Sequence, residues 1–379
     1  MCHPIRSLLL GMVVSCGVVA PGWSQRPSTR QVTIPDAPIC EECRIILTRT
    51  GRIQDSDRPG LLPGFPFGFG STAQGHILVL LGGSGPLIFN PNGTFLGFLG
   101  RQGSGPEEFQ RPGRVISLGG DTLLILDSGN RRATLARING EFLGSHPFNT
   151  QGLHTIIRMT DTILLMNAIV AEPERVGFPL HTVSIHGKLL ASFGAESANP
   201  RFRAGEISWQ RRLARGTGNR FWVADRFRYM VDRYGVMDRS PDLRIRRTAE
   251  WFREPTLGHQ SASATTLGSS FIVGLHQPSD SLLWIVSVVA DSNWKRESGL
   301  RGSGSPVGRA ESADLRYLHD TIVEAIDLRS WRVLARTRVD QYVADITEHG
   351  YLITYEETDG GVVLDVFTIS LDRLASRSR

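Results

Sequence analysis

Cysteine and lysine are both scarce in this chain of 379 residues. It contains four cysteines, and Lys188 and Lys295 are its only lysines, so nearly all of its positive charge is arginine. The formal net charge of +5 is modest for a chain of this length. A solvated surface of mixed charge accounts for such a balance without any special partner.

Several catalytic motifs are absent as well. The glycine-rich stretch GRQGSGPEEFQRPG, residues 100–113, has no lysine, and Pro106 and Pro112 prevent the helix that a phosphate-binding loop requires. The chain contains no Gly-x-Ser-x-Gly and no His-Glu-x-x-His sequence. These absences argue against a phosphate-loop nucleotide site, an α/β-hydrolase nucleophile and a zincin-type protease.

The first residues predict export. Arg6 precedes an apolar run, residues 8–20, which is too short to span a bilayer and is followed by the small residues Gly22 and Ser24. We therefore expect a signal peptide over residues 1–24, release to the periplasm or the extracellular space, and no transmembrane helix after its removal. An alternative makes Cys16, at the end of VVSC, a lipid-attachment site, which would anchor the exported chain without changing its fold.

Two cysteines remain in the predicted mature chain, Cys40 and Cys43. In an oxidising compartment such a pair most simply forms a local disulfide. The pair leads into an apolar, β-branched segment rather than a helix, which disfavours the alternative of a redox-active motif. Two thiolates do not complete a zinc site, and no histidine follows Cys43 as a covalent haem site would require.

An internal repeat predicts the fold. Hairpin turns of the form Xaa-Gly occur at Gly93, Gly140, Gly187 and Gly235, which are 47, 47 and 48 residues apart. Short apolar runs separated by turn residues precede each anchor, and no segment has sustained helical periodicity. A period of this length is typical of four-stranded propeller blades. The sequence therefore predicts an all-β chain, a six-bladed β-propeller of four-stranded antiparallel blades.

The ends of the chain suggest how the ring closes. The last unit, from residue 342, supplies only three strands, and the strand beginning at residue 44 has no other partner. We expect this N-terminal strand to complete the last blade, because closure leaves no open sheet edge. The predicted organisation is a segment over 25–42 and a propeller over 43–374, with an insertion near 291–319 in the fifth blade.

Residues 98–143 resemble the NHL-type repeat of bacterial six-bladed propellers. The resemblance rests on GFLGRQGSGPEEFQRPGRV and on the following LLILDSGNRRATLARINGEFL, with its Asp-x-x-Asn-x-Arg turn. It implies that the glycine-rich stretch crosses from one blade to the next, with Phe109 between the sheets. We interpret Asp127, Asn130 and Arg132 as structural turn residues, because such side chains cap nearby backbone groups. The chain also resembles a secreted bacterial propeller group with no settled activity.

The axial channel is the expected site, since the first residues of the innermost strands converge there. The candidate ligand-binding residues at its mouth are Arg114, His154, Arg211, His259 and Asp345. Two arginines disfavour a cation and suit an anion. We therefore expect no metal and no other cofactor. The alternative is a lyase or lactonase-type hydrolase that holds calcium or zinc in the channel.

Two other charged features have simpler explanations. Glu107 and Glu108 are neighbours in an extended linker, so they point apart and do not form a pair of catalytic carboxylates. Residues 211–247 interleave arginines with aromatics as nucleic-acid binders do, but export argues against that partner. The sequence thus favours a non-catalytic scaffold that binds an unidentified protein or an anionic small molecule or glycan, with no nucleic acid and an undetermined oligomeric state.

Overall fold

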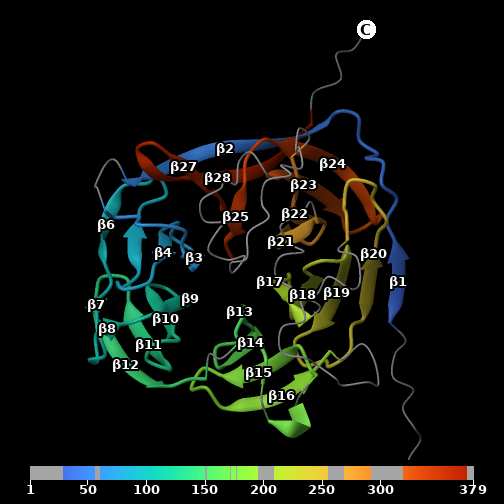
Figure 1. Cartoon of the computed structure of the whole chain (residues 1–379). Coiled ribbons are helices and arrows are strands. Elements are labelled where there is room, and N and C mark those ends of the chain that lie inside the picture. The colour runs from blue at the N-terminus through green and yellow to red at the C-terminus, as the bar shows by residue number, and fades with distance from the viewer. Residues whose placement is uncertain are drawn as a thin grey trace, which may run out of the picture.

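The computed structural model describes residues 29–55, 60–149, 152–170, 172–175, 177–194, 209–254, 269–291 and 319–373. Within these ranges six small sheets stand around a common axis, as the ring in Figure 1 shows. This arrangement confirms the predicted six-bladed β-propeller. The expected signal peptide, His259 and residues 292–318 of the expected insertion lie outside the described residues.

Blades 1 to 3 follow one another along the chain, each with its first strand innermost. Blade 1 comprises β3 (Gly68–Ser71), β4 (Ile77–Leu80), β5 (Leu87–Phe89) and β6 (Phe95–Phe98). Blade 2 comprises β9 (Pro112–Gly119), β10 (Thr122–Asp127), β11 (Arg132–Arg137) and β12 (Phe142–Pro147). Blade 3 comprises β13 (Thr155–Arg158), β14 (Ile163–Asn167), β15 (Leu180–Ser184) and β16 (Leu189–Phe193), with the short 3-10 helix η2 (Pro173–Arg175) before β15.

Blades 4 to 6 complete the ring. Blade 4 comprises β17 (Arg211–Arg215), β18 (Arg220–Asp225), β19 (Met230–Gly235) and β20 (Leu243–Arg246). Blade 5 comprises β21 (Phe271–Ser279), β22 (Leu282–Ala290), β23 (His319–Asp327) and β24 (Arg332–Val339). Blade 6 comprises β25 (Val343–Ile346), β26 (Leu352–Thr354) and β28 (Gly361–Arg373), with β27 (Glu356–Thr358) beside β28.

The core lies between the blades. The middle strands read as continuous apolar runs because neighbouring sheets cover both of their faces, and all four residues of β4 are fully buried. Phe109 is also fully buried and packs with Leu99 of the linker and with Leu123 and Ile125 of blade 2. The linker phenylalanine therefore fills the space between sheets, as expected.

The N-terminal strand closes the ring. β2 (Cys43–Gln54) pairs antiparallel with β28 along its whole length, so it is the outer strand of blade 6. Ile53 of β2 and Leu364 of β28 join the same buried cluster as Ile77 and Phe89 of blade 1. The expected closure by an N-terminal strand is confirmed, and Cys40 and Cys43 just before it form a disulfide.

A second N-terminal strand was not expected. β1 (Arg30–Thr33) pairs in parallel with β20, and it is therefore a fifth strand on blade 4. The chain then follows the outside of the ring, where Ile39 N and Cys40 N donate hydrogen bonds to Val333 O and Leu334 O of blade 5. Residues 30–54 thus contact the outer strands of blades 4 and 5 and then form the outer strand of blade 6.

Three of the four repeat anchors occupy tight turns. Gly93, Gly140 and Gly187 have positive φ values of 89, 96 and 80°, a region that favours glycine. Gly235 differs, because it is the last residue of β19 and a longer connection leads to β20. The hairpin prediction therefore identified the strands correctly in all four blades and the tight turn in three.

Candidate functional site

The six inner strands line a narrow cavity of about 100 Å³. Each of β3, β9, β13, β17, β21 and β25 contributes to it, which places the cavity on the axis of the ring. A Cβ atom at Gly70 would lie 2.2 Å from Val115 Cγ1, and one at Gly274 would lie 2.4 Å from Ile346 Cγ2. Glycine at these positions lets neighbouring inner strands approach closely, which keeps the channel narrow.

Charged side chains gather where the inner strands begin. Arg114, Arg212 and Asp345 line the cavity from the first residues of β9, β17 and β25. Burial lowers the pKa of Arg114 to about 10 and also lowers the pKa of Arg212, although the Asp345 carboxylate favours both charges. Burial raises the pKa of Asp345, whereas the two arginines lower it. These three groups are surrounded by protein but keep some exposure to the channel.

A third arginine reaches the same place from the turn after β18. Arg226 Nη1 donates hydrogen bonds to His154 Nε2 and to Gln210 Oε1, both at 2.9 Å. Its guanidinium carbon also lies 4.9 Å from the ring centre of Phe271. Burial and, next to it, the positive charge of Arg212 lower the pKa of Arg226 to about 9. The Asp345 carboxylate acts in the opposite direction but does not offset them.

His154 is neutral at this site. Its Nδ1 lies 3.1 Å from Arg211 O, and its Nε2 accepts from Arg226. Because a carbonyl oxygen only accepts and a guanidinium only donates, these partners assign the proton to Nδ1. Burial lowers the pKa of His154 well below its usual range, and Arg212 and Arg226 lower it further. The imidazole therefore adds no positive charge of its own at pH 7.

We use the name channel mouth for the five side chains of Arg114, His154, Arg212, Arg226 and Asp345. They hold three guanidinium groups and one carboxylate. Among the described residues, the buried Nε atoms of Arg212 and Arg226 have no hydrogen-bond partner. A buried donor without an acceptor is costly, so the arrangement can accept an anion with several oxygen atoms.

The structure gathers three of the five sequence-predicted site residues. Arg114, His154 and Asp345 belong to the channel mouth, and His259 lies outside the described residues. Arg211 begins an inner strand as expected, but its side chain forms an ion pair with Asp225 at 3.1 Å, and both groups are buried. The cavity lining includes the adjacent Arg212 instead of Arg211.

Of the two neighbouring arginines at the start of β17, the second lines the cavity and the first, which the sequence suggested, does not appear in its described lining. Successive side chains of a strand point to opposite sides, so only one of Arg211 and Arg212 can face the channel. Arg211 is opposite Asp225 on β18, and its backbone N–H donates to Asn167 Oδ1 at 2.8 Å. The Asp225 in the following strand was the available signal for an internal ion pair at Arg211. No comparable pattern marks Arg226, which lies in a turn.

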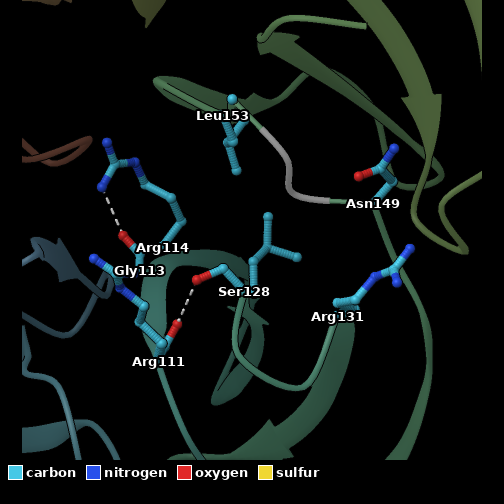
Figure 2. A pocket seen from close by; sticks show the side chains of 9 residues that line it. Arg111, Gly113, Arg114, Ser128, Arg131, Asn149 and Leu153 are labelled. Carbon is cyan, nitrogen blue, oxygen red and sulfur yellow. Dashed lines mark hydrogen bonds between the residues drawn. The ribbon is translucent and has the colours of Figure 1, made fainter. Parts of the chain in front are cut away.

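A larger pocket adjoins the channel mouth between blades 2 and 3. Its volume is about 670 Å³, and Arg114 lines both it and the axial cavity. Figure 2 shows Arg111 and Arg114 on one side of the pocket and Arg131 with Asn149 on the other. The described lining residues carry three arginines and no carboxylate: Arg111, Gly113, Arg114, Leu126, Ser128, Arg131, Asn149, Gly152 and Leu153.

One acidic cluster lies apart from the residues that line the axial cavity. Carboxylate oxygens of Asp291, Asp320 and Asp340 come within 4.8 Å of one another. Burial raises the pKa of Asp320, and the other two carboxylates raise it further, but Arg338 Nε is bonded to Asp320. The guanidinium occupies part of the space that a cation would use. The donor set suits a hard cation only if Arg338 moves.

The Asp-x-x-Asn-x-Arg turn is held by internal contacts. Asp127 is fully buried, and its carboxylate accepts backbone hydrogen bonds from Gln110, Arg111 and Gly129 at 2.8 to 3.0 Å. Asn130 Nδ2 donates to Asp127 and to the Gly103 carbonyl, and Arg132 donates to carbonyl groups of the linker. The contacts give these three side chains a structural role in fixing the linker on blade 2.

Glu108 is part of the same linker. Its carboxylate accepts from Gly105 N at 2.7 Å and from Arg101 Nε at 2.8 Å. These hydrogen bonds lower the pKa of Glu108. The residue folds the glycine-rich stretch over itself, which gives Glu108 a structural role in the linker.

Solved structures with a similar fold are known, but they share little sequence identity with this chain. No protein-family model and no curated protein sequence matches the chain. A Bacteroides fragilis protein described as a "putative exported protein" has a similar structure, with a TM-score of 0.57 and 12% identity, over 90% of this chain and 99% of that one. A member of the DUF4221 family from Bacteroides vulgatus also has a similar structure, with a TM-score of 0.57 and 9% identity. The likeness covers 87% of this chain and 99% of that one. These likenesses show a shared propeller fold.

A streptogramin B lyase is a more distant likeness. Its TM-score is 0.42 and its identity 9%, over 87% of this chain and 98% of that one. A similarity of this size carries no argument about catalysis. Within the described ranges, no helix has both the length and the apolar character needed to cross a bilayer.

Proposed function

We propose that this chain is an exported, non-catalytic β-propeller that binds an anionic small molecule, or an anionic group of a partner, at the channel mouth. The observation that carries the proposal is the pair of buried Nε donors on Arg212 and Arg226 that have no acceptor among the described residues. A carboxylate or phosphate would supply acceptors to both and would offset the surplus of two positive charges.

The surroundings favour an anion over a cation. The guanidinium groups repel one another, and the charges of Arg212 and Arg114 both lower the pKa of Arg226. A bound anion reverses that effect, whereas a metal ion adds to the repulsion. The walls of a narrow channel have a low dielectric constant and strengthen the electric field at its mouth.

Export is supported by the sequence and by one neighbour. The first residues have the pattern of a signal peptide, and the two cysteines beyond it are joined, as suits an oxidising compartment. The similar Bacteroides fragilis structure is described as that of a "putative exported protein". We extend that location to this chain as part of the proposal.

Calorimetric titration of the exported chain with D-galacturonate tests the site. D-galactose serves as the neutral counterpart of the same size. We expect galacturonate to bind and galactose not to bind, and we expect Arg212→Gln to weaken galacturonate at least tenfold. Arg246→Gln is the control, because it removes the same charge from an exposed position of the same blade. Equal binding of the two sugars, or unchanged binding by Arg212→Gln, would overturn the proposal.

The enzymatic alternative remains a metal-dependent lyase or lactonase-type hydrolase with calcium or zinc in the channel. Metal analysis of the purified protein distinguishes the metal-dependent enzyme from the anion-binding scaffold. Stoichiometric calcium or zinc that is retained by an Asp345→Asn variant less well than by the wild type would favour the enzyme. Metal that is lost in an Asp320→Asn variant but retained in Asp345→Asn would be bound at the acidic cluster of Asp291, Asp320 and Asp340. That result would be compatible with an anion site in the channel.

A further inference from the structure

The pocket between blades 2 and 3 continues the channel mouth. Arg114 lines both spaces, and Leu153 of the pocket directly precedes His154 of the mouth. The pocket is several times larger than the axial cavity, at about 670 Å³ against about 100 Å³. A ligand with one anionic group at the mouth therefore has room for a body of several rings in the pocket.

The pocket carries its own positive charge. Arg114 directs its donors to backbone carbonyls, with Nη1 at 3.0 Å from Phe67 O and Nε at 3.1 Å from His154 O, and the carboxylate that favours its charge, Asp345, lines the axial cavity and not the pocket. The Arg111 guanidinium lies 5.1 Å from the ring centre of Phe67, and the described lining residues include no acidic side chain. These charges favour a ligand that is anionic along its length.

Arg131 is presented to the pocket by a strained turn. Its φ of 52° lies in the left-handed region that few residues other than glycine and asparagine adopt. Its carbonyl accepts from Phe148 N at 3.1 Å, and Asp127 caps the same turn, so the backbone is fixed. Figure 2 shows this arginine across the pocket from Arg111 and Arg114.

The remaining lining is mixed. Ser128 and Asn149 offer hydroxyl and amide groups, whereas Leu126 and Leu153 offer apolar surface. Compact inorganic anions use only charge and donors, but a pyranose ring has both hydroxyl groups and an apolar face. This combination of donors, apolar surface and separated arginines matches a saccharide that carries a carboxylate on successive rings.

We propose that the ligand is an acidic oligosaccharide, with one uronate at the channel mouth and the following uronates in the pocket between blades 2 and 3. The inference rests on the proposed function, because the first uronate uses the same arginines. It adds that Arg111 and Arg131 bind the carboxylates of later rings. Affinity must then rise with chain length, and this rise must depend on the pocket alone.

The test compares mono-, di- and trigalacturonate by calorimetry on the wild-type chain and on Arg131→Gly. Glycine suits the positive φ at this position, so the variant removes the charge and relieves backbone strain. We expect trigalacturonate to bind the wild type at least tenfold more tightly than the monomer. In Arg131→Gly we expect the monomer to bind as before and the trimer to lose most of that gain. Arg239→Gln, at an exposed position between β19 and β20, is the charge-matched control and should retain the full gain.

The outcomes separate the two proposals. Monomer binding with no gain for the trimer, or a gain that Arg131→Gly retains, would overturn the pocket inference and leave the channel-mouth site standing. Absence of binding by all three uronates would overturn both proposals for acidic saccharides. Tighter binding of tripolyphosphate than of trigalacturonate would show that the pocket prefers compact anions and would overturn the saccharide class. Equal binding of maltotriose would show that charge is not used.

Discussion

Cys43, the first residue of β2, pairs with Arg373, the last residue of β28, so the two ends of the described propeller lie together in one antiparallel strand pair. The ring is thus held closed by backbone hydrogen bonds between residues more than three hundred positions apart in sequence. β2 covers the edge that β28 would otherwise expose, and we therefore expect the fold to require the N-terminal strand.

Removal of residues through Gly51 should therefore destroy cooperative folding. The truncation deletes most of β2 and exposes β28 as an open edge with unpaired backbone groups. We expect aggregation or a broad, non-cooperative melt in calorimetry. Removal of residues 1–28 is the control, since it leaves β1 and β2 intact. A chain truncated through Gly51 that melts like this control would contradict closure by β2.

The N-terminal segment is also fastened by a buried ion pair. Arg247 Nη1 lies 2.6 Å from Glu324 Oε2, and Nη2 lies 2.5 Å from Asp36 Oδ1. Burial alone would lower the pKa of Arg247, but Tyr229 and Glu324 raise it above its usual value. The guanidinium therefore joins blade 4, blade 5 and the N-terminal segment in one network.

Glu324→Ala should cost about 3 kcal/mol of unfolding free energy, because it leaves Arg247 buried with one carboxylate fewer. Denaturant unfolding measures the loss. Asp242→Ala provides the comparison, since it breaks a pair with Arg233 that is partly exposed and is worth no more than about 1 kcal/mol. Similar losses for both variants would mean that the buried network adds nothing beyond a surface pair.

Burial of His181 predicts a loss of stability in acid. His181 is fully buried, its Nδ1 lies 2.8 Å from Ser192 Oγ, and burial lowers its pKa to about 4. Because the pKa is higher in the unfolded state, the unfolded chain takes up the proton first as the pH falls. The contribution of neutral His181 to the free energy of unfolding is fully present above about pH 6.5. About 3 kcal/mol of that free energy is lost by pH 4. A histidine NMR titration with a midpoint near 6.5 for His181 would show that this account is wrong.

Processing at the N-terminus has a direct readout. We expect the exported chain to begin near residue 25 and its mass to be lower by two hydrogens, because Cys40 and Cys43 are joined. Intact-mass spectrometry before and after reduction measures both. A lipid mass on Cys16 would move the first residue and place the propeller at a membrane surface.

The repeat made the fold predictable because it is a local signal that recurs. Turn residues near Gly93 and Gly140 and the apolar runs around them define each blade independently of the others. β1 was not predictable in this way. Its four residues have no partner within their own repeat, and Arg30 pairs with Leu243, which lies more than two hundred positions further along the chain.

The site was only partly predictable, for a related reason. Strand starts could be counted from the repeat, which located Arg114 and Asp345. The side to which each side chain points depends on strand phase, and a shift of one residue exchanges Arg211 for Arg212. Arg226 contacts His154 of the channel mouth from a turn, where no periodicity indicates the direction of a side chain.

The two neighbouring arginines of β17 provide the most direct test of the central claim, which is that an anion binds to the guanidinium groups of the channel mouth. Arg211 is paired with Asp225, whereas Arg212 lines the channel with a buried Nε that lacks an acceptor among the described residues. Galacturonate affinity and melting temperature are measured together for Arg211→Gln and Arg212→Gln. The account predicts that Arg212→Gln loses affinity at least tenfold with an unchanged or higher melting temperature, and that Arg211→Gln lowers the melting temperature while the folded protein still binds. Retained affinity in Arg212→Gln, or loss of affinity only in Arg211→Gln, would contradict it.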